Sequence, residues 1–145
     1  MTGPVLVDTS AWIAYLRPGD SPLDEILPQI VRGGRARLCG PVMSELLQGV
    51  RDNHQTARLN SLISALPFVE IERSDWLAAG LSLRRLRGQG ITVPLSDALI
   101  ATVAERRALD LLTLDAHFQH FEIKRLRIGP RPPRAASRSG LDRED

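Results

Sequence analysis

Residues 5–16 read VLVDTSAWIAYL, an apolar run that is interrupted by the carboxylate of Asp8. The residues before Asp8 are apolar throughout, as in a central strand of a parallel sheet, and a helical stretch follows near residues 10–17. An unpaired charge at such a boundary destabilises the fold unless another group compensates for it. The role of Asp8 therefore depends on which groups the rest of the chain brings to it.

Outward from this stretch, short β-type runs alternate with longer helical ones. We predict further strands over residues 36–40, 68–72 and 111–114, and an edge strand over 125–128. Predicted helices cover residues 21–32, 42–50, 74–87 and 95–107, a stretch with the apolar face Leu59, Leu62, Ile63 and Leu66, and a short segment within 115–121. The alternation predicts an α/β fold in which helices cover both faces of a central, mostly parallel sheet of four to five strands.

Capping residues and prolines predict several helix boundaries. The Asp-Ser-Pro segment at residues 20–22 predicts the start of one helix, and the glycine pair at residues 33–34 predicts its end. Pro41 fits the first position of the following helix. Ser74 is expected to cap the helix that runs to about residue 87.

The composition fits one globular domain of 145 residues, with 43% hydrophobic and 25% charged residues. The single cysteine, Cys39, excludes an internal disulfide and fits a reducing compartment. The N-terminus has no basic segment ahead of its apolar stretch, and no run approaches the roughly 18 apolar residues of a membrane span. We therefore expect a cytoplasmic protein that does not engage a membrane.

Charge is distributed unevenly along the chain. Residues 1–123 carry 12 arginines and 14 acids, whereas residues 124–145 carry seven cations and three acids. The excess positive charge belongs to the C-terminal segment, where residues 129–145 are rich in Pro, Arg, Ser and Gly and have little to bury. We predict a folded domain over residues 1–128 and a basic, disordered tail over residues 129–145.

Four acids lie at element boundaries in apolar surroundings. Asp8 ends the first predicted strand, Glu45 lies one turn into the helix after the second, Asp97 lies in the first turn of the helix over 95–107, and Asp115 follows the fourth strand. In an open parallel sheet the carboxyl ends of all strands share one edge, and ligands bind at that edge. We therefore expect these carboxylates, which are distant in sequence, to converge.

A cluster of carboxylates does not stay fully ionised by itself, because like charges raise one another's pKa. A hard divalent cation resolves the conflict: Mg²⁺ prefers oxygen ligands, and Mn²⁺ accepts the same ones. Such a metal activates a bound water and neutralises the charge that develops on a phosphodiester during hydrolysis. Ser10 and Thr113, each two residues from one of the acids, are expected to orient the carboxylates through hydrogen bonds.

Each acid taken alone also fits a structural role. Asp8 and Asp115 precede predicted helices that their side chains could cap, and Asp97 is an acid in a first helical turn. His117 and His120 follow the last acid closely, but a short polar helix is typical of surface histidines, and we expect both at the surface. The spacing of the acids by itself leaves the structural and the metal-binding roles open.

The motifs VDTSAWIAYL, SELLQG, SDALIATVA and LLTLDAHF, in this order, resemble the PIN-domain family, and in particular the VapC-type ribonuclease toxins of bacterial toxin–antitoxin pairs. The resemblance spans about residues 4–128 and implies a PIN-like α/β/α sandwich. It makes the four acids the catalytic and metal-binding quartet, with Thr113 as the supporting hydroxyl; the quartet is Asp8, Glu45, Asp97 and Asp115.

The resemblance also implies a Mg²⁺- or Mn²⁺-dependent endoribonuclease that forms a homodimer and is inhibited by a small VapB-type antitoxin. Structured RNA is the expected substrate, and the candidates for phosphate contacts are Arg17, Arg51, Arg84, Arg85 and Arg87. The apolar face within residues 59–66, preceded by Leu46, Leu47 and Val50, is either core or part of a groove for a partner.

Two other functions use similar acids. An aspartyl phosphatase places a nucleophilic Asp after the first strand, but it requires a second acid two residues after Asp8, where this chain has Ser10. A receiver-like signalling module binds Mg²⁺ with acids at strand ends and requires a nearby lysine. The single lysine of this chain, Lys124, instead precedes the last predicted strand. Labelling by a small phosphodonor would favour the receiver-like function.

Overall fold

The computed structural model describes residues 3–17, 19 and 21–126. Its centre is a sheet of four parallel strands, β1 (Val5–Val7), β2 (Ala36–Cys39), β3 (Phe68–Val69) and β4 (Asp110–Leu112), in the order β3-β2-β1-β4. The predicted α/β fold with a mostly parallel sheet is confirmed. The predicted tail over residues 129–145 and the last two residues of the predicted edge strand lie outside the described residues.

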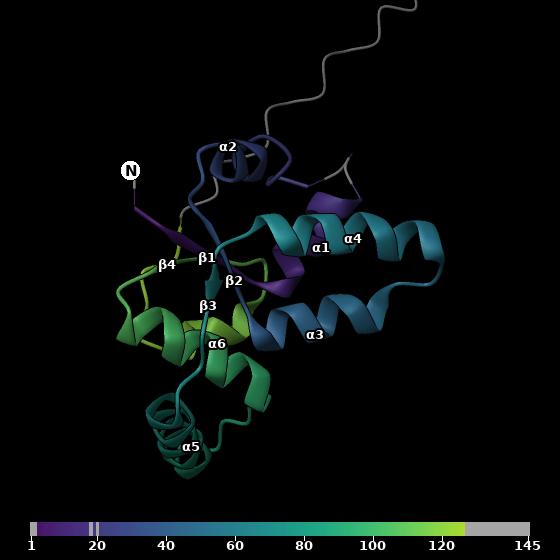
Figure 1. Cartoon of the computed structure of the whole chain (residues 1–145). Coiled ribbons are helices and arrows are strands. Elements are labelled where there is room, and N and C mark those ends of the chain that lie inside the picture. The colour runs from purple at the N-terminus through teal and green to yellow at the C-terminus, as the bar shows by residue number, and fades with distance from the viewer. Residues whose placement is uncertain (1–2, 18, 20, 127–145) are drawn as a thin grey trace, which may run out of the picture.

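Helices lie on both sides of this sheet (Figure 1). In chain order they are α1 (Thr9–Leu16), α2 (Ile26–Arg32), α3 (Gly40–Gly49), α4 (Asn53–Ala65), α5 (Arg73–Gly88) and α6 (Leu95–Arg106), followed by the short 3-10 helix η1 (Ala116–His120). Figure 1 shows α5 and α6 together on one side of the strands and α1 and α4 on the other. This is the predicted α/β/α sandwich.

The core confirms the apolar character predicted for two elements. All three residues of β1 are fully buried, as expected for a strand with neighbours on both sides. Every residue of helix α6 from Asp97 to Ala104 is buried, so the rest of the protein covers this helix on nearly all sides. Trp12 and Phe118 are the largest fully buried side chains.

The helix predicted over residues 21–32 is shorter than expected. Residues 22–25 form turns, and α2 begins only at Ile26. The Asp24 carboxylate accepts hydrogen bonds from the N–H groups of Gly19 and Ser21, and the Ser21 hydroxyl accepts one from Leu23. These side-chain bonds compete with helical ones and hold the segment as a local turn. The predicted end at residues 33–34 is confirmed, with Gly34 in the left-handed region at φ 69°.

The prediction that Ser74 caps α5 is wrong. The N-cap residue is Glu72, and its side chain and that of Asp75 form a reciprocal capping box. The same box shortens the strand predicted over residues 68–72 to Phe68–Val69, because the backbone N–H of Glu72 is bound to Asp75 and not to a neighbouring strand.

Other boundaries shift by one or two residues. Gly40 is already the first residue of α3, so the second strand ends at Cys39 and Pro41 occupies the second helical position. The fourth strand covers Asp110–Leu112 and not residues 111–114. The predicted edge strand is reduced, within the described residues, to a parallel bridge between Arg125 and Leu111. No helix in the described part of the chain is long and apolar enough to cross a bilayer.

Candidate metal centre

The strand order reverses direction at β1, which lies between β2 and β4. Crevices of parallel sheets open at the carboxyl ends of the strands beside such a reversal. Asp8 directly follows β1, and its backbone N–H donates to the carbonyl of Leu112 at the end of β4, at 2.9 Å. Because Val7 pairs with Leu112, continuing the register places Asp8 opposite Thr113. At the point where the strand order reverses, the Asp8 carboxylate therefore lies opposite the Thr113 hydroxyl.

Two hydroxyls hold the Asp8 side chain, which is only 4% exposed. Ser10 Oγ and Thr113 Oγ1 each donate to Asp8 Oδ2 at 2.8 Å. Ser10 Oγ in turn accepts the N–H of Leu114 at 3.0 Å, and Thr113 Oγ1 accepts the N–H of Asp115 at 3.0 Å. The predicted hydrogen bonds of Ser10 and Thr113 are thus present, and they fix one oxygen of Asp8 in orientation.

The structural alternative for Asp8, a helix-capping side chain, is not what the structure contains. Asp8 is the N-cap residue of α1 by backbone geometry, but its carboxylate makes no capping hydrogen bond. Asp115 does cap, because its Oδ1 accepts the N–H of His117 in η1 at 2.9 Å. Capping therefore explains Asp115 in part and leaves the burial of Asp8 unexplained.

Asp97 and Asp115 meet at His117. The imidazole Nδ1 lies 3.0 Å from Asp97 Oδ2 and 3.3 Å from Asp115 Oδ1. An ionised carboxylate only accepts hydrogen bonds, so Nδ1 carries the proton when both acids are charged. One donor atom from each of these three residues lies within 4.8 Å of the others, which is close enough for one metal ion to contact all three.

Glu45 completes the cluster from α3. This helix starts immediately after β2, which brings its second turn to the same edge of the sheet. Among the described residues, Glu45 Oε1 is buried without a hydrogen-bond partner. A buried, unpaired carboxylate oxygen is unfavourable in a folded protein unless it binds something further.

The charges of the four acids act on one another. Burial raises the pKa of Glu45, and the charges of Asp8 and Asp97 raise it further. Burial also raises the pKa of Asp97, as do the charges of Asp115 and Asp8, against the hydrogen bond from His117, which lowers it. Asp97 therefore lies within electrostatic reach of the other three acids, and Glu45 also lies within reach of Asp8.

A divalent cation fits this donor set. The site offers carboxylate oxygens, an unpaired Glu45 oxygen and mutual repulsion that a positive ion would relieve, and these are properties that favour hard cations with oxygen ligands. The residues that could hold the ion are the four acids, with the imidazole of His117 beside two of them.

Sequence reasoning underestimated His117. The residue lies at the surface, as predicted, with half of its side chain exposed, but its inner nitrogen contacts two acids of the cluster. Its spacing of two residues from Asp115 was the available signal. This spacing alone does not show that the imidazole contacts Asp97. The contact forms because the turn of η1 directs the ring towards α6.

The geometry does not favour the two alternative functions. The position that an aspartyl phosphatase would fill with a second acid is Ser10, whose hydroxyl is bound to Asp8. The receiver-like function needs a lysine at the acids, but Lys124 Nζ lies 4.0 Å from Asp110, a residue outside the cluster.

Comparison with known proteins agrees with this arrangement. The model of the PIN-domain family matches residues 5–124, which include all four acids and Thr113. The chain belongs to the PIN-domain family. Similar relatives are VapC ribonuclease Mb1587 of Mycobacterium bovis and ribonuclease VapC11 of Mycobacterium tuberculosis. Each is 32% identical over 118 residues, which is 79% of this chain and 88% of the relative. The predicted resemblance to VapC-type chains is confirmed.

Solved structures share the fold of this PIN domain. DNA-bound VapBC from Salmonella typhimurium aligns with a TM-score of 0.72 at 20% identity, covering 85% of this chain and 96% of that one. VapBC2 from Rickettsia felis, bound to a promoter DNA fragment, gives 0.71 at 16% identity with the same coverage. The Mycobacterium tuberculosis toxin VapC20, described as cleaving the sarcin-ricin loop, gives 0.64 at 16% identity, covering 85% and 98%.

Proposed function

We propose that this PIN domain is a metal-dependent endoribonuclease and the toxin of a VapB–VapC-type pair. The observation that carries the proposal is the convergence of four carboxylates from separate elements, two with raised pKa values and one with an unpaired buried oxygen. The names of the similar relatives, VapC ribonucleases, support RNA as the substrate.

The four acids would hold Mg²⁺, or Mn²⁺ in its place; these ligands are Asp8, Glu45, Asp97 and Asp115. When bound, such an ion supplies an activated water and neutralises charge on the phosphodiester. Ser10 and Thr113 keep Asp8 oriented, and His117 keeps Asp97 and Asp115 oriented, so the ligands are arranged before the ion arrives. Hydrolysis then breaks one backbone P–O bond as the oxygen of water joins phosphorus.

RNA cleavage tests this proposal directly. The purified chain, freed of any antitoxin, is incubated with structured cellular RNA in Mg²⁺, in Mn²⁺ and in EDTA, beside a folded Asp97→Asn variant. We expect discrete fragments with either metal and intact RNA with EDTA or the variant. Intact RNA in every lane, together with Mn²⁺ binding that the variant does not change, would remove the nuclease function.

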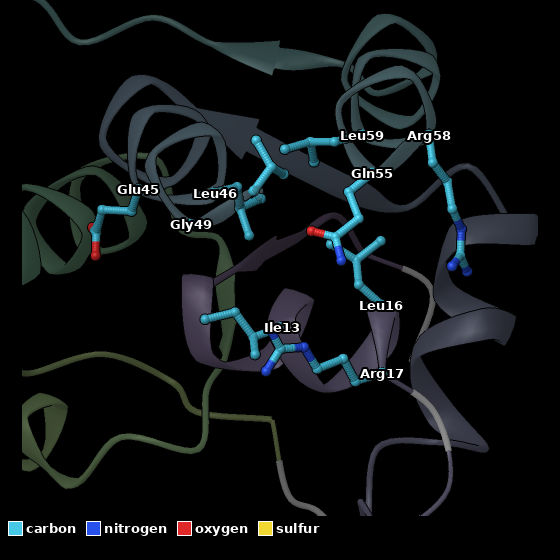
Figure 2. Close-up of a pocket in the computed structure, with 10 residues that line it drawn as sticks. Ile13, Leu16, Arg17, Glu45, Leu46, Gly49, Gln55, Arg58 and Leu59 are labelled. Carbon is cyan, nitrogen blue, oxygen red and sulfur yellow. The ribbon is translucent and has the colours of Figure 1, made fainter. Parts of the chain in front are cut away.

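An antitoxin site is proposed in the groove between α1, α3 and α4, a cavity of about 220 Å³ (Figure 2). Figure 2 shows Ile13 and Leu16 of α1 facing Leu46 of α3 and Leu59 of α4, with Glu45 at one end. Leu46 and Leu59 belong to the core, and Ile13 is 47% exposed. Leu46 and Leu59, which belong to the face that the sequence left as core or groove, are buried and also line this cavity, and we propose that an amphipathic segment of a VapB-type partner binds there. Ile13→Asp is expected to weaken binding of such an antitoxin without unfolding the chain, measured by titration calorimetry.

A homodimer is proposed through the part of α5 up to Leu81 and the residues beside it, away from Arg84 and Arg87 at the end of that helix. Large apolar side chains are exposed there and beside it; these are Phe68, Trp76, Leu77, Leu81 and Leu95. An apolar patch of this kind is typical of protein interfaces. We expect Leu77→Arg to shift the molar mass in light scattering from dimer to monomer.

We propose the reducing cytoplasm as the compartment of this toxin, because its RNA substrates are found there.

A further inference from the structure

A second pocket lies at the C-terminal end of α5, apart from the acidic cluster and the groove of Figure 2. It encloses about 290 Å³ and is lined by Gly80, Leu83, Arg84, Arg87, Ile91, Thr92 and Val93. Its helical members recur at positions 80, 83, 84 and 87, so one face of α5 forms one wall. The remaining wall is the loop that leads from α5 to α6.

The two arginines of this pocket have no partner in the described part of the chain. Arg84 and Arg87 are exposed, and neither guanidinium makes an ion pair or hydrogen bond there. Arg106 and Arg107, by contrast, are both bound to Asp75. Between Asp75 and Asp97 the sequence holds three arginines and no acid, within a body where acids outnumber arginines. The pocket is therefore locally positive.

The helix dipole explains only part of this arrangement. Cations in a last helical turn are favoured by the partial negative charge of the helix end, and Arg85 and Arg87 lie there. That effect does not require Arg84 and Arg87 to share a cavity with the exposed hydroxyl of Thr92. All three groups can donate hydrogen bonds, and two carry positive charge, which is the donor set that phosphate oxygens prefer.

The loop connects this pocket to the candidate metal centre. The N–H of Ile91 donates to the carbonyl of Leu86 at 2.9 Å, and Val93 is buried, so both ends of the segment are fixed against the fold. The next residue, Pro94, is the N-cap of α6, and Asp97 lies in the first turn of that helix. Thr92 of the pocket is thus only five residues before Asp97 of the candidate metal centre.

We propose that the pocket of Arg84, Arg87 and Thr92 is a phosphate subsite for the RNA strand flanking the cleaved bond. The inference rests on the proposed nuclease function and adds the place where the substrate backbone is held. The two guanidiniums and the hydroxyl bind backbone phosphate oxygens, and the apolar wall of Leu83, Ile91 and Val93 contacts the intervening ribose. Such contacts fix register and carry no sequence information.

The test is the salt dependence of RNA binding by the full chain. A fluorescein-labelled RNA hairpin is titrated in EDTA, which prevents metal-dependent cleavage, and its anisotropy is followed over a range of KCl concentrations. Arg84→Ala and Arg87→Ala are compared with Arg73→Ala. Arg73 is also exposed, has the same charge, and lies at the other end of the same helix, about 21 Å from Arg87. We expect each pocket variant to weaken binding several-fold and to reduce the slope of log Kd against log salt by about 1, with Arg73→Ala unchanged.

A second variant tests the space inside the pocket without changing its charge. A Cβ added at Gly80, which lines the pocket, would meet nothing within 4 Å, so Gly80→Leu adds bulk at the pocket wall and keeps every arginine in the sequence. We expect it to weaken RNA binding as well, and to raise KM for cleavage while kcat stays unchanged. Equal effects of Arg73→Ala and Arg84→Ala, with none from Gly80→Leu, would overturn the subsite, as would loss of VapB-type antitoxin binding with RNA binding intact.

The proposed nuclease function is judged separately on the same hairpin. Cleavage by the wild-type chain in Mg²⁺ supports that function whatever the pocket variants do. Unchanged anisotropy of the variants alongside normal wild-type cleavage rejects the subsite alone. Absence of both cleavage and binding by the wild type rejects the function, and the subsite with it.

Discussion

Asp75 and Asp97 are the same residue in the same local position, and they behave in opposite ways. Each is the third residue of a helix and follows a serine, in Arg73-Ser74-Asp75 of α5 and Leu95-Ser96-Asp97 of α6. Each is buried, at 1% and 8% exposure. The hydrogen bonds from Arg107 are the main cause that lowers the pKa of Asp75 to about 2, whereas burial among other acids raises the pKa of Asp97.

The partners account for this difference. Arg106 Nε donates to Asp75 Oδ1 at 3.0 Å, and Arg107 Nη2 donates to Oδ2 at 2.6 Å, so both oxygens of Asp75 are neutralised and the end of α6 is tied to the start of α5. Within the described residues, the carboxylate of Asp97 has a hydrogen bond to His117 alone, and the charges that raise its pKa are those of Asp115 and Asp8. A fully partnered acid stabilises the fold, while an acid left among acids is available to a cation.

Activity is expected to separate the two residues most strongly. Asp97→Asn keeps the size and the hydrogen bond to His117 but removes a proposed metal ligand, so RNA cleavage should fall about 100-fold or more. Asp75→Asn, measured at a temperature well below its own Tm, should keep kcat within about twofold of the wild type. Equal losses of kcat in the two folded variants would contradict a metal-binding role that Asp97 has and Asp75 lacks.

Stability is expected to separate them in the opposite direction. Asp75→Asn removes the negative charge that pairs with Arg106 and Arg107 and weakens the capping box, so the free energy of unfolding should fall by about 2 kcal/mol and Tm by about 4–8 °C. Asp97→Asn in EDTA should unfold at the same or a higher temperature, since it removes repulsion at a functional site. Differential scanning calorimetry of both variants measures this, and destabilisation of Asp97→Asn by a similar amount would assign that residue to structure.

The hydroxyl of Thr113 tests whether the acids are held in place by their neighbours. Thr113→Val keeps the shape of the side chain but removes the donor to Asp8 and the acceptor for the N–H of Asp115. Mn²⁺ affinity in calorimetry should fall about 10–100-fold. Thr56→Val on α4 loses only the hydrogen bond from the Thr56 hydroxyl to the carbonyl of Asp52, and it should leave Mn²⁺ affinity at the wild-type value. Matching losses in both variants would show that the Thr113 hydroxyl has no special part.

The change of Tm with pH is the smallest of the expected effects. Because the pKa values of Glu45 and Asp97 are raised in the folded state, the folded chain binds protons more readily than the unfolded one. In EDTA, lowering the pH from neutral through these raised values should therefore increase Tm by about 1–3 °C. Below about pH 4 the sign reverses, because the stabilisation by Asp75 is lost as the pH falls towards its folded pKa of about 2. Thermal scans with saturating Mn²⁺ should lack the first rise, and a Tm that falls steadily from pH 7 without metal would contradict it.

Sequence determined the placement of the acids because parallel strands impose it. Asp8 and Asp115 follow strands whose carboxyl ends must share an edge, and Glu45 and Asp97 lie in the second and the first turn of helices that start at that edge. The α/β architecture was predicted from the alternation of strand-type and helix-type runs, the burial of α6 from its apolar residues, and the roles of the Ser10 and Thr113 hydroxyls from their spacing from the acids. The metal-binding and catalytic roles of these residues stay predictions.

Tertiary structure decided what surrounds each acid. Local sequence treats the Ser-Asp pairs of α5 and α6 alike, and only the packing of the two helices brings Arg106 and Arg107 to Asp75 and leaves Asp97 facing Glu45 and Asp8. The contact of His117 with Asp97 likewise depends on the turn that brings η1 to α6, and the pocket at Arg84 and Arg87 depends on how the loop after α5 folds back on that helix. The order of strands and helices in the sequence determines which edge of the sheet a charged side chain lies at. The charges of the groups around that side chain, and hence its pKa, depend on contacts between residues far apart in sequence.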